Sequence, residues 1–469
     1  MDTIESVTHG LVAAMTAEEV DVVVIGMGPG GEDVAGHLAE SGLSVVGIDE
    51  LLVGGECPYW GCIPSKMMIR AANLLVEGRR IDGMAGTAHV TADWSPVAAR
   101  IRTEATDNWN DQVAVERFEG KGGQFVRGTG RMIDRDVVEV GTRTFRARRA
   151  VVVAAGTAAA APPIPGLAEV PYWTNREAIE TETVPASLIV LGGGAIGVEL
   201  AQVFARFGSK VTIIEAASQL LPFEEPEVGP VMADALGADG ADVRTNSTAA
   251  AASHANGRCT VELDDGASVS AEQLLVATGR RADLARIGAE AAGVDPAARW
   301  MPVDERLRVT DGVWAVGDIT GKGAVTHVAM YQSAIAAADI LGEPLSPASY
   351  KALPRVTFSD PEVGSVGLTE AAAREAGIRV AVGTTEVPST ARGWIHKAGN
   401  EGFIKVIADS SRSVLVGATS VGPVGGEVLG LLCLAVHAEV PIATLRSMIY
   451  AYPTFHRGIE DALRALHAT

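Results

Sequence analysis

The sequence contains few cysteines and few basic residues, and both shortages narrow what the protein can be. Only four cysteines occur among 469 residues, and Cys259 and Cys433 stand far from any other. They are expected to be buried small hydrophobic residues. A secreted disulfide framework is excluded, so a reducing, cytoplasmic compartment is expected. Lysine and arginine number 38 against 58 aspartate and glutamate, a formal net charge of -20, which argues against nucleic acid or an anionic membrane as partner.

The sequence also lacks a long uninterrupted apolar run. Its longest apolar stretches are broken by Pro162, Pro163 and Pro165, or by His437 and Glu439, so no segment is expected to span a bilayer. The first twenty residues carry acids and no basic region, so no signal peptide is expected there. At 469 residues the chain is too long for one core, and about three domains are expected.

Two of the four cysteines lie close together. Cys57 and Cys62 precede a helix-like run from Met67 to Leu75. In a regular α-helix, residues five positions apart lie roughly 8 Å apart at Cα, beyond the reach of a disulfide. We therefore expect a distorted first helical turn, with Pro58 at the first helical position and a kink at Pro64. A disulfide held there is expected to be reducible and catalytic; the other interpretation is two buried free thiols.

Two segments have the pattern of a nucleotide-binding βαβ unit. In the first, a β-branched run over residues 21–26 is followed by Gly26, Gly28 and Gly31, a helix-like segment to Glu40 and a second strand over residues 44–48. In the second, residues 188–191 are followed by Gly192, Gly194 and Gly197, and a second strand covers residues 210–214. Such glycines allow a tight turn and close backbone approach, so that the helix N-terminus faces a pyrophosphate.

An acidic residue ends the second strand of each unit. Asp49 follows Gly26 by 23 residues, and Glu215 follows Gly192 by the same interval. A carboxylate at this place can accept a hydrogen bond from a ribose 2′-hydroxyl. Two dinucleotide sites and a disulfide predict an electron relay between a tightly bound flavin and a diffusing nicotinamide carrier. Because Cys57 follows Asp49 by only eight residues, the first unit is assigned to the flavin.

On these residues the chain resembles the pyridine nucleotide-disulfide oxidoreductases, the group of dihydrolipoamide dehydrogenase, glutathione reductase and mercuric reductase. The resemblance extends from about Asp21 to Leu466 and includes residues 155–157, 277–280, 313–318, 326–329 and 358–367. It implies an α/β fold with two Rossmann-like dinucleotide-binding domains and a C-terminal α+β dimerisation domain. The implied domains are an N-terminal extension (1–20), a discontinuous FAD-binding domain (21–155 and 281–345), an NAD(P)-binding domain (156–280) and a dimerisation domain (346–469).

The resemblance also implies roles for single residues. Cys62 would be the thiol next to the flavin, and Cys57 the interchange thiol that meets the substrate. Lys66, four residues beyond Cys62 on the same helical face, would pair with Glu199 near flavin and nicotinamide; otherwise it is a solvated helix lysine. The implied cofactor-binding positions, with Asp49 on the adenosine ribose and Asp318 on the ribityl chain, are Gly26, Gly28, Gly31, Asp49, Gly55, Lys66, Gly156, Asp318, Gly192, Gly194, Gly197, Glu215 and Gly279. A homodimer is expected, in which the dimerisation domain completes the partner subunit's active site.

The C-terminal segment departs from the family pattern. Family members carry His-Pro-Thr-x-x-Glu, whose histidine shuttles a substrate proton, an effect of roughly 10²- to 10⁴-fold in rate. Here Tyr452 and Arg457 take the places of the histidine and the glutamate, and tyrosine, with an ordinary pKa near ~10, is a poor base at neutral pH. His456 and Glu460, spaced i, i+4, could form a substitute dyad; otherwise His456 is a surface or interface residue. Lipoamide and oxidised glutathione are therefore expected to be poor substrates.

Other departures concern the acceptor and the carrier. Mercuric reductase resembles this terminus in having a tyrosine there, but the chain ends at Thr469 without that enzyme's additional cysteine pair, and no metal site is expected. Tyr59 and Trp60 are bulkier than the family's usual residues and either line an aromatic substrate pocket or pack beside the flavin. Ala216, Ala217 and Ser218 follow Glu215, so no arginine is expected nearby to bind a 2′-phosphate, and NADH is expected to be preferred over NADPH.

The sequence thus predicts an FAD-dependent NAD(P)H oxidoreductase that passes electrons from NADH through the flavin and the Cys57–Cys62 disulfide to a disulfide or related small-molecule acceptor. Three alternatives remain open at this point. They are a reductase for quinones or similar acceptors with an ancillary disulfide, a small-molecule dithiol oxidase, and a non-catalytic flavin-binding subunit.

Overall fold

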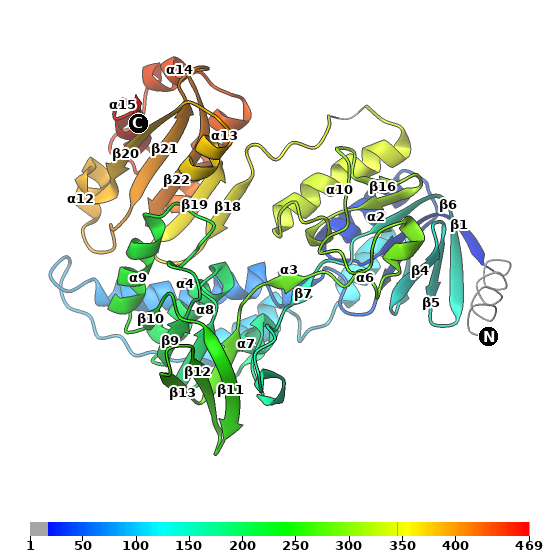
Figure 1. Ribbon diagram of the computed structural model, residues 1–469, viewed down its shortest axis with the longest axis horizontal. Helices are drawn as coiled ribbons and strands as arrows, with labels where there is room; N and C mark the ends of the chain where they lie inside the picture. Colours follow the sequence, from blue (N-terminus) through cyan, green and yellow to red (C-terminus); the bar gives the residue numbers. More distant parts are fainter. Residues whose placement is uncertain (1–16, 345, 469) are drawn as a thin grey trace. The chain divides into compact units, whose positions relative to one another are not determined.

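The structure, a computed structural model, describes residues 17–344 and 346–468, and the chain divides into two compact units (Figure 1). The first unit comprises Met1–Pro64, Ile101–Ala159 and Arg280–Ser349, and the second Ser65–Arg100, Ala160–Gly279 and Tyr350–Thr469. Of the predicted N-terminal extension, residues 1–16 lie outside the described residues. The remainder is not a separate segment, because the first strand already begins at Glu18.

An eight-stranded sheet forms the centre of the first unit. Strands β17, β6, β1, β2 and β3 are parallel neighbours in that order. Alternate residues of β1 point to opposite faces: Val22 and Val24 pack with helices α2 and α10, whereas Val23 and Ile25 pack with β4 to β6. The strands are β1 (Glu18–Ile25), β2 (Val45–Asp49), β3 (Gln124–Arg127), β4 (Gly130–Asp134), β5 (Val137–Val140), β6 (Arg143–Val153), β16 (Arg308–Thr310) and β17 (Val313–Ala315).

The helices of the first unit contribute most of the residues around Cys57. The longer ones are α2 (Pro29–Glu40), α6 (Gln112–Gly120) and α10 (Thr326–Leu341), with the short α3 (Glu56–Tyr59). The remaining elements are the π-helix η1 (Ile101–Ala105), the 3₁₀ segments η3 (Ala289–Ala292) and η4 (Asp318–Thr320), and the two-residue strands β7 (Ala158–Ala159) and β15 (Arg280–Arg281), which pair with each other. Helices α2 and α10 lie side by side (Figure 1).

The second unit contains a parallel sheet of the same kind, in the order β10-β9-β8-β14, beside an antiparallel sheet β11-β12-β13. Its strands are β8 (Ser187–Leu191), β9 (Lys210–Ile214), β10 (Asp242–Arg244), β11 (Ala249–Ala255), β12 (Arg258–Leu263), β13 (Ser268–Ala271) and β14 (Gln273–Val276). Its helices here are α4 (Cys62–Arg79, which begins in the first unit), α5 (Ser95–Arg100), η2 (Leu167–Glu169), α7 (Asn175–Glu180), α8 (Ala195–Arg206) and α9 (Val228–Ala238).

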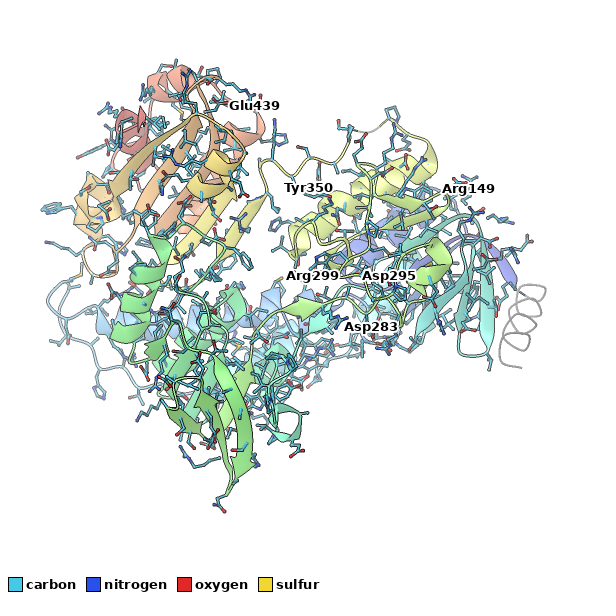
Figure 2. The ribbon with its side chains drawn as sticks, viewed as in Figure 1. Arg149, Asp283, Asp295, Arg299, Tyr350 and Glu439 are labelled. Carbon is cyan, nitrogen blue, oxygen red and sulfur yellow. The ribbon has the colours of Figure 1, made fainter. Side chains whose placement is uncertain are left out.

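A six-stranded sheet in the order β18-β19-β22-β21-β20-β23 forms the C-terminal part of the second unit, and all its pairs are antiparallel. Glu439 follows α13 (Figure 2) and forms ion pairs with Lys351, at 2.9 Å, and with Arg412. The pair with Lys351 connects this end of the helix to the segment before β18. The elements are β18 (Pro354–Thr357), β19 (Glu362–Gly367), α11 (Glu370–Glu375), β20 (Val380–Glu386), η5 (Val387–Ser389), α12 (Ala391–His396), β21 (Phe403–Asp409), β22 (Val414–Gly422), α13 (Gly425–His437), α14 (Ile442–Ser447), α15 (Gly458–Arg464) and β23 (His467–Ala468).

Two parallel sheets that each begin with a strand, a glycine loop and a helix, together with a C-terminal antiparallel sheet, confirm the predicted fold class. Apart from Glu18–Val20, each large sheet lies inside one of the predicted domains. The borders of those domains remain a prediction. Within residues 17–344 and 346–468, no helix combines the length and the apolar character that crossing a bilayer requires.

Candidate functional site

Cys57 and Cys62 lie on either side of a break between two helices. Cys57 is in α3, and Cys62 is the first residue of the 18-residue helix α4. The single distorted turn predicted for this segment is therefore wrong. Pro58 and Pro64 are each the third residue of their helix rather than the first, and α4 continues through Pro64. The first four backbone N–H groups of a helix have no partner within it, so neither proline removes a helical hydrogen bond.

The two cysteines are present as thiols beside the hydroxyl of Thr326. Cys62 Sγ lies 3.2 Å from Thr326 Oγ1, at the start of α10. A hydrogen bond with Cys62 and then burial raise the pKa of Cys57 far above its ordinary value. Cys57 therefore keeps its proton at neutral pH, whereas the N-terminus of α4 favours a thiolate at Cys62. Thr326 was not among the predicted site residues, although its segment 326–329 was noticed.

The glycine loop of the first unit leaves no room for side chains. Gly26 has φ of +93°, and a Cβ there would lie 2.4 Å from the carbonyl oxygen of Ala154. A Cβ on Gly31 would lie 1.9 Å from the oxygen of Gly26, and one on Gly55 would lie 2.8 Å from Cα of Gly28. Helix α2 has Gly28 at its N-cap and no side-chain cap. Its first N–H groups therefore remain available to an anionic group such as a pyrophosphate.

Two half-buried carboxylates border this loop and the thiol segment. Asp49 accepts hydrogen bonds from the backbone N–H groups of Met27 (2.7 Å) and Leu51 (2.8 Å). Burial nevertheless raises its pKa. Asp318, at the start of η4, accepts a hydrogen bond from Thr157 Oγ1 at 3.0 Å, and burial raises its pKa as well. Half-buried carboxylates beside a glycine loop suit the hydroxyl groups of a ribose and a ribityl chain, so these residues fit FAD.

Arg280 fixes the surroundings of Asp318. Its Nε donates to Thr157 Oγ1 at 2.8 Å, and its Nη1 lies 3.6 Å from the carboxylate of Glu56, which precedes Cys57. This row of contacts joins the thiol segment to Asp318. The sequence indicated both segments, 155–157 and 277–280, but gave no role to Thr157 or Arg280. Of the predicted glycines in these segments, Gly156 and Gly279 have φ of +65° and +130°.

The glycine loop of the second unit repeats the first in detail. Gly192 has φ of +109°, and a Cβ on Gly197 would lie 2.0 Å from the oxygen of Gly192. Glu215 accepts hydrogen bonds from Gly193 N (2.5 Å) and Ala217 N (2.7 Å). Helix α8 has Gly194 at its N-cap, again without a side-chain cap. The arrangement fits a second dinucleotide.

An arginine missed by sequence reasoning lies near this second acidic residue. Arg244 is on β10, beside β9, and its backbone oxygen accepts a hydrogen bond from Glu215 N at 2.8 Å. Its side chain pairs with Asp242, at 2.9 Å. The expectation that no arginine is nearby therefore holds along the sequence but not across the sheet.

Lys66 and Glu199 form the pair that the resemblance implies. Lys66 Nζ lies 2.8 Å from Glu199 Oε2 and 4.7 Å from the centre of the Phe358 ring. Glu199 Oε1 accepts a hydrogen bond from Phe358 N at 2.8 Å, and the Glu199 side chain is only 7% exposed. Because both of its oxygens are engaged, this carboxylate holds the lysine in one place. The interpretation of Lys66 as a freely solvated helix lysine is wrong.

The C-terminal residues do not form the substitute dyad. Helix α15 begins at Gly458, so His456 precedes it, and His456 Nε2 lies 3.5 Å from Thr454 Oγ1. Glu460 instead pairs with Arg457 (2.9 Å) and Arg464. Tyr452, which stands where the family has its histidine, is 70% exposed. No described contact provides either Tyr452 or His456 with a carboxylate partner.

The two remaining cysteines and the two aromatic residues have distinct environments. Burial raises the pKa of both Cys259 and Cys433, but only Cys259 is fully buried and Cys433 is half-buried.

Tyr59 and Trp60 are buried with ring centres 5.9 Å apart. Tyr59 lines a pocket that also contains Cys57, and Trp60 is not among its lining residues. Of the two, only Tyr59 therefore lines a pocket, and that a substrate occupies this pocket remains a prediction.

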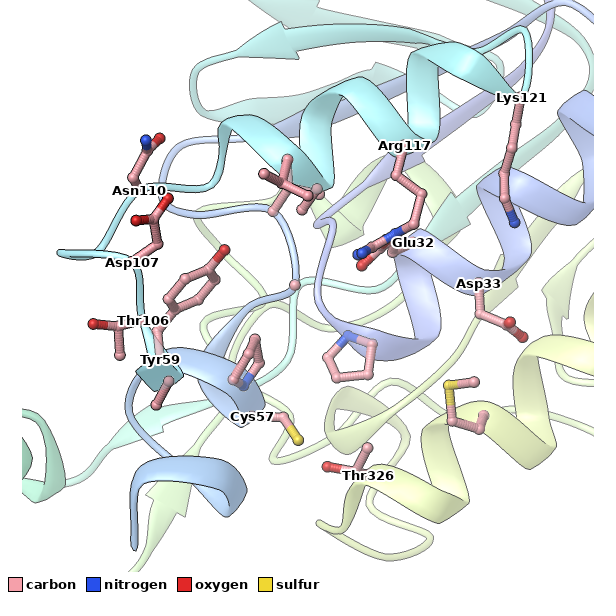
Figure 3. Close-up of a pocket in the computed structure, with 18 residues that line it drawn as sticks. Glu32, Asp33, Cys57, Tyr59, Thr106, Asp107, Asn110, Arg117, Lys121 and Thr326 are labelled. Atoms are coloured by element: carbon pink, nitrogen blue, oxygen red, sulfur yellow. The ribbon is translucent and has the colours of Figure 1, made fainter. Parts of the chain in front are cut away.

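This pocket, of about 590 Å³, lies within the first unit (Figure 3). Its walls come from α2, α3, α6, α10 and the segment after η1. That segment includes three consecutive non-glycine residues with positive φ, Asp107, Asn108 and Trp109. Such conformations are costly and cluster where function requires them. The lining residues are Pro29, Glu32, Asp33, Val53, Gly54, Cys57, Pro58, Tyr59, Ala105, Thr106, Asp107, Asn110, Val113, Ala114, Arg117, Lys121, Thr326 and Met330.

Comparison with known families agrees with this site. Residues 20–333 match the family described as pyridine nucleotide-disulphide oxidoreductase, and residues 353–463 match its dimerisation domain. The chain belongs to the pyridine nucleotide-disulfide oxidoreductase family. It is 33% identical over 462 residues to a dihydrolipoyl dehydrogenase of Chlorobaculum tepidum, covering 95% of this chain and 97% of that protein.

Members of this family with other names are equally similar. A mercuric reductase of Acidithiobacillus ferrooxidans is 31% identical, over 97% of this chain and 84% of that protein. The HOCl-induced flavoprotein disulfide reductase RclA of Escherichia coli has a TM-score of 0.83 at 28% identity, covering 95% of this chain and 99% of the other. The protein is thus an FAD-dependent oxidoreductase that uses a pyridine nucleotide. The alternative of a non-catalytic subunit is set aside, and the dimerisation domain supports a homodimer.

Proposed function

We propose that the protein uses NADH to reduce a small-molecule disulfide through Cys57 and Cys62. One observation carries this proposal: the Cys57 thiol lines a pocket, and Cys62 and Thr326 lie directly beside it. A thiol that meets an outside molecule and a second thiol that can close on it are what exchange of a disulfide requires. The names of the relatives, one of them a flavoprotein disulfide reductase, support the same class of reaction.

The proposed steps balance as two successive exchanges. The sulfur of Cys57 attacks one sulfur of the substrate, whose sulfur–sulfur bond breaks, and the thiol proton of Cys57 passes to the departing sulfur, so that the first product leaves as a thiol. Cys62 then attacks Cys57 Sγ, releases the second thiol and closes the Cys57–Cys62 disulfide. When bound, the flavin would pass two electrons from the nicotinamide to this disulfide, and two protons from the solvent would complete the dithiol. Thr326 donates a hydrogen bond to the thiolate of Cys62 until this thiolate attacks Cys57 Sγ.

NADH is the proposed carrier because of Glu215. A carboxylate at the end of this strand accepts a hydrogen bond from a 2′-hydroxyl and repels a 2′-phosphate. Arg244 lies near but is paired with Asp242. A comparison of kcat/KM for NADH and NADPH tests this point, and a tenfold advantage for NADPH would overturn it.

Single serine variants test the roles of the two thiols. Cys57→Ser and Cys62→Ser are each expected to lose disulfide reduction, by three orders of magnitude or more, because one exchange step has no nucleophile. Cys57→Ser should show a long-wavelength absorbance band from the Cys62 thiolate beside oxidised flavin without prior reduction, and Cys62→Ser should lack it. Alkylation of reduced protein by iodoacetamide, followed by mass spectrometry, reports the two thiols independently of turnover. Variants that keep wild-type activity towards every disulfide would refute the proposal.

A second candidate, reduction of quinones or similar acceptors with an ancillary disulfide, is favoured by Tyr452. Neither Tyr452 nor the displaced His456–Glu460 pair provides the proton shuttle of the family's disulfide reductases. The protein should therefore turn over lipoamide and oxidised glutathione about 10²- to 10⁴-fold more slowly than an enzyme that has this base. Menadione reduction that survives in both serine variants would favour this candidate.

A repaired C-terminal pair tests the missing base directly. Tyr452→His with Arg457→Glu is expected to raise lipoamide turnover if proton transfer is the only defect, and His456→Ala should change little. Fast lipoamide turnover by the wild type, at tens per second, would contradict the importance given to Tyr452. We also propose that the C-terminal segment of one subunit, which contains Tyr452 and His456, completes the active site of the partner subunit. A cytoplasmic location, inferred from low cysteine content, also remains a prediction.

A further inference from the structure

We propose that the pocket beside Cys57 selects disulfides that carry a positively charged amine on each side of the sulfur–sulfur bond. This inference rests on the proposed function, because it concerns the substrate of the same thiol. It goes further in naming the charge and the shape of that substrate. Three kinds of observation carry it: unmatched charges in the pocket wall, their placement around Cys57, and a tyrosine hydroxyl in that wall with no partner among the described residues.

The two cations of the pocket wall are already matched by carboxylates. Arg117, on α6, forms an ion pair with Glu32 of α2. Lys121 Nζ lies 3.5 Å from Glu40, also on α2. Neither cation is therefore free to attract an anionic substrate without giving up an existing pair. A glutathione-like disulfide, which carries several carboxylates, finds no unmatched positive charge among the lining residues.

Two carboxylates of the wall have no cation. Within residues 17–344 and 346–468, Asp33 and Asp107 take part in no ion pair, and the one side-chain partner of Asp33 is the hydroxyl of Ser333. Figure 3 shows Asp107 and Asp33 on opposite sides of Cys57. A small disulfide whose sulfur–sulfur bond lies at Cys57 would therefore have one carboxylate near each arm. This placement suits a dication better than a molecule with a single charge.

Tyr59 adds an independent sign that a polar ligand enters on the Asp107 side. The residue is only 6% exposed and lines the pocket, yet its hydroxyl makes no hydrogen bond to any described residue. The hydroxyl is not among the buried side-chain atoms that lack a partner, so it opens to the pocket, where a polar ligand can reach it. Burial raises the pKa of Tyr59, with Asp111 adding to the effect, so the hydroxyl stays neutral. Its oxygen can accept a hydrogen bond from an ammonium group.

A series of disulfides that share a sulfur–sulfur bond with a two-carbon spacer on each side separates the effect of charge. Cystamine is a dication, bis(2-hydroxyethyl) disulfide is neutral, and 3,3′-dithiodipropionate is a dianion. The holoenzyme with NADH should show the highest kcat/KM for cystamine and the lowest for the dianion. Two partly exposed charge pairs predict a preference of about five- to twentyfold between cystamine and the neutral compound. Raising the salt concentration should narrow the preference, because such pairs are screened.

Variants of the two carboxylates assign the preference to the pocket. The preference is the ratio of kcat/KM for cystamine to kcat/KM for bis(2-hydroxyethyl) disulfide. Asp107→Asn and Asp33→Asn should each lower this ratio by about two- to fivefold, and the double variant should bring the ratio close to one. Asp295→Asn is the matched control: it removes a carboxylate from the same unit outside the pocket (Figure 2) and should leave the preference unchanged. Tyr59→Phe should raise KM for cystamine more than KM for the neutral compound.

The outcomes separate this inference from the proposed function. A preference for the dianion, or a cystamine preference that Asp33→Asn with Asp107→Asn leaves intact, overturns the inference while disulfide reduction stands. If no disulfide of the series is reduced but menadione is, the proposed function itself is wrong. Circular dichroism and Tm of each variant show whether a lost preference reflects the pocket or the fold, and an unfolded double variant leaves the single variants to decide.

Discussion

The two glycine loops have nearly the same local structure but different surroundings. In each, a carboxylate at the end of the second strand accepts an N–H from the residue after the first glycine, Met27 in one and Gly193 in the other. In each, it also accepts an N–H from the residue two positions after itself. The same spacing of glycines and acid thus produces the same hydrogen bonds twice in one chain.

The surroundings of the loops differ. In the first loop, a Cβ on Gly30 would lie 3.1 Å from Cβ of Ala329, and a Cβ on Gly28 would lie 4.0 Å from Cα of Gly55. In the second, no described atom lies within 4 Å of the Cβ position of Gly194, and Ile196 is 38% exposed. The first loop is enclosed by α10 and the thiol segment, whereas the second is open. We infer that enclosure suits a cofactor that stays bound, and openness one that exchanges.

The largest effect is expected at the last glycine of each loop. Gly31→Ala and Gly197→Ala place a Cβ 1.9 Å and 2.0 Å from a backbone oxygen, so the loop must shift in both. Gly31→Ala should purify without FAD, and Gly197→Ala should keep FAD but lose NADH-dependent flavin reduction. The absorbance ratio of flavin to protein and anaerobic NADH titration measure these outcomes. The opposite pattern would reverse the assignment of the two loops.

An intermediate effect is expected at the two acids. Asp49→Asn should weaken FAD binding about tenfold, because a hydrogen bond to a charged group contributes about 1.5–3 kcal/mol, and should leave the NADH/NADPH preference alone. Glu215→Gln should narrow that preference by a similar factor without loss of FAD. Reconstitution of apoprotein with FAD and kcat/KM for each carrier are the measurements. If each variant affected both cofactors equally, the loops would not act independently.

The smallest effect concerns enclosure itself. Gly30→Ala brings a Cβ against Ala329 and should destabilise the first unit by about 1–3 kcal/mol through overpacking. Ile196→Ala, at the corresponding position of the open loop, should change stability by no more than about 0.5 kcal/mol. Urea unfolding monitored by circular dichroism and by flavin fluorescence compares the two. Equal destabilisation would show that the second loop is enclosed as well.

The sequence predicted the features that depend on short stretches of chain. The β-branched runs, the glycine loops and the equal interval from Gly26 to Asp49 and from Gly192 to Glu215 all correspond to observed strands and turns. The pairing of Lys66 with Glu199 also followed from the resemblance. Prediction failed where it extended a helical pattern too far. A helix over residues 456–460 was assumed for His456 and Glu460, but α15 begins at Gly458.

Tertiary structure decided which distant residues meet, because those contacts depend on packing rather than on local backbone preference. Thr326 lies 264 residues from Cys62 in the sequence yet 3.2 Å from its sulfur. Arg280 reaches Thr157 across 123 residues, and the pairing of β10 with β9 places Arg244 beside Glu215. The amino-acid sequence by itself predicted two glycine loops, each with its acidic residue, and singled out one pair of neighbouring thiols, because these features depend on local spacing. Only the folded chain brought Asp33, Tyr59 and Asp107 together with Cys57 in the wall of one pocket, because packing decides which distant side chains meet.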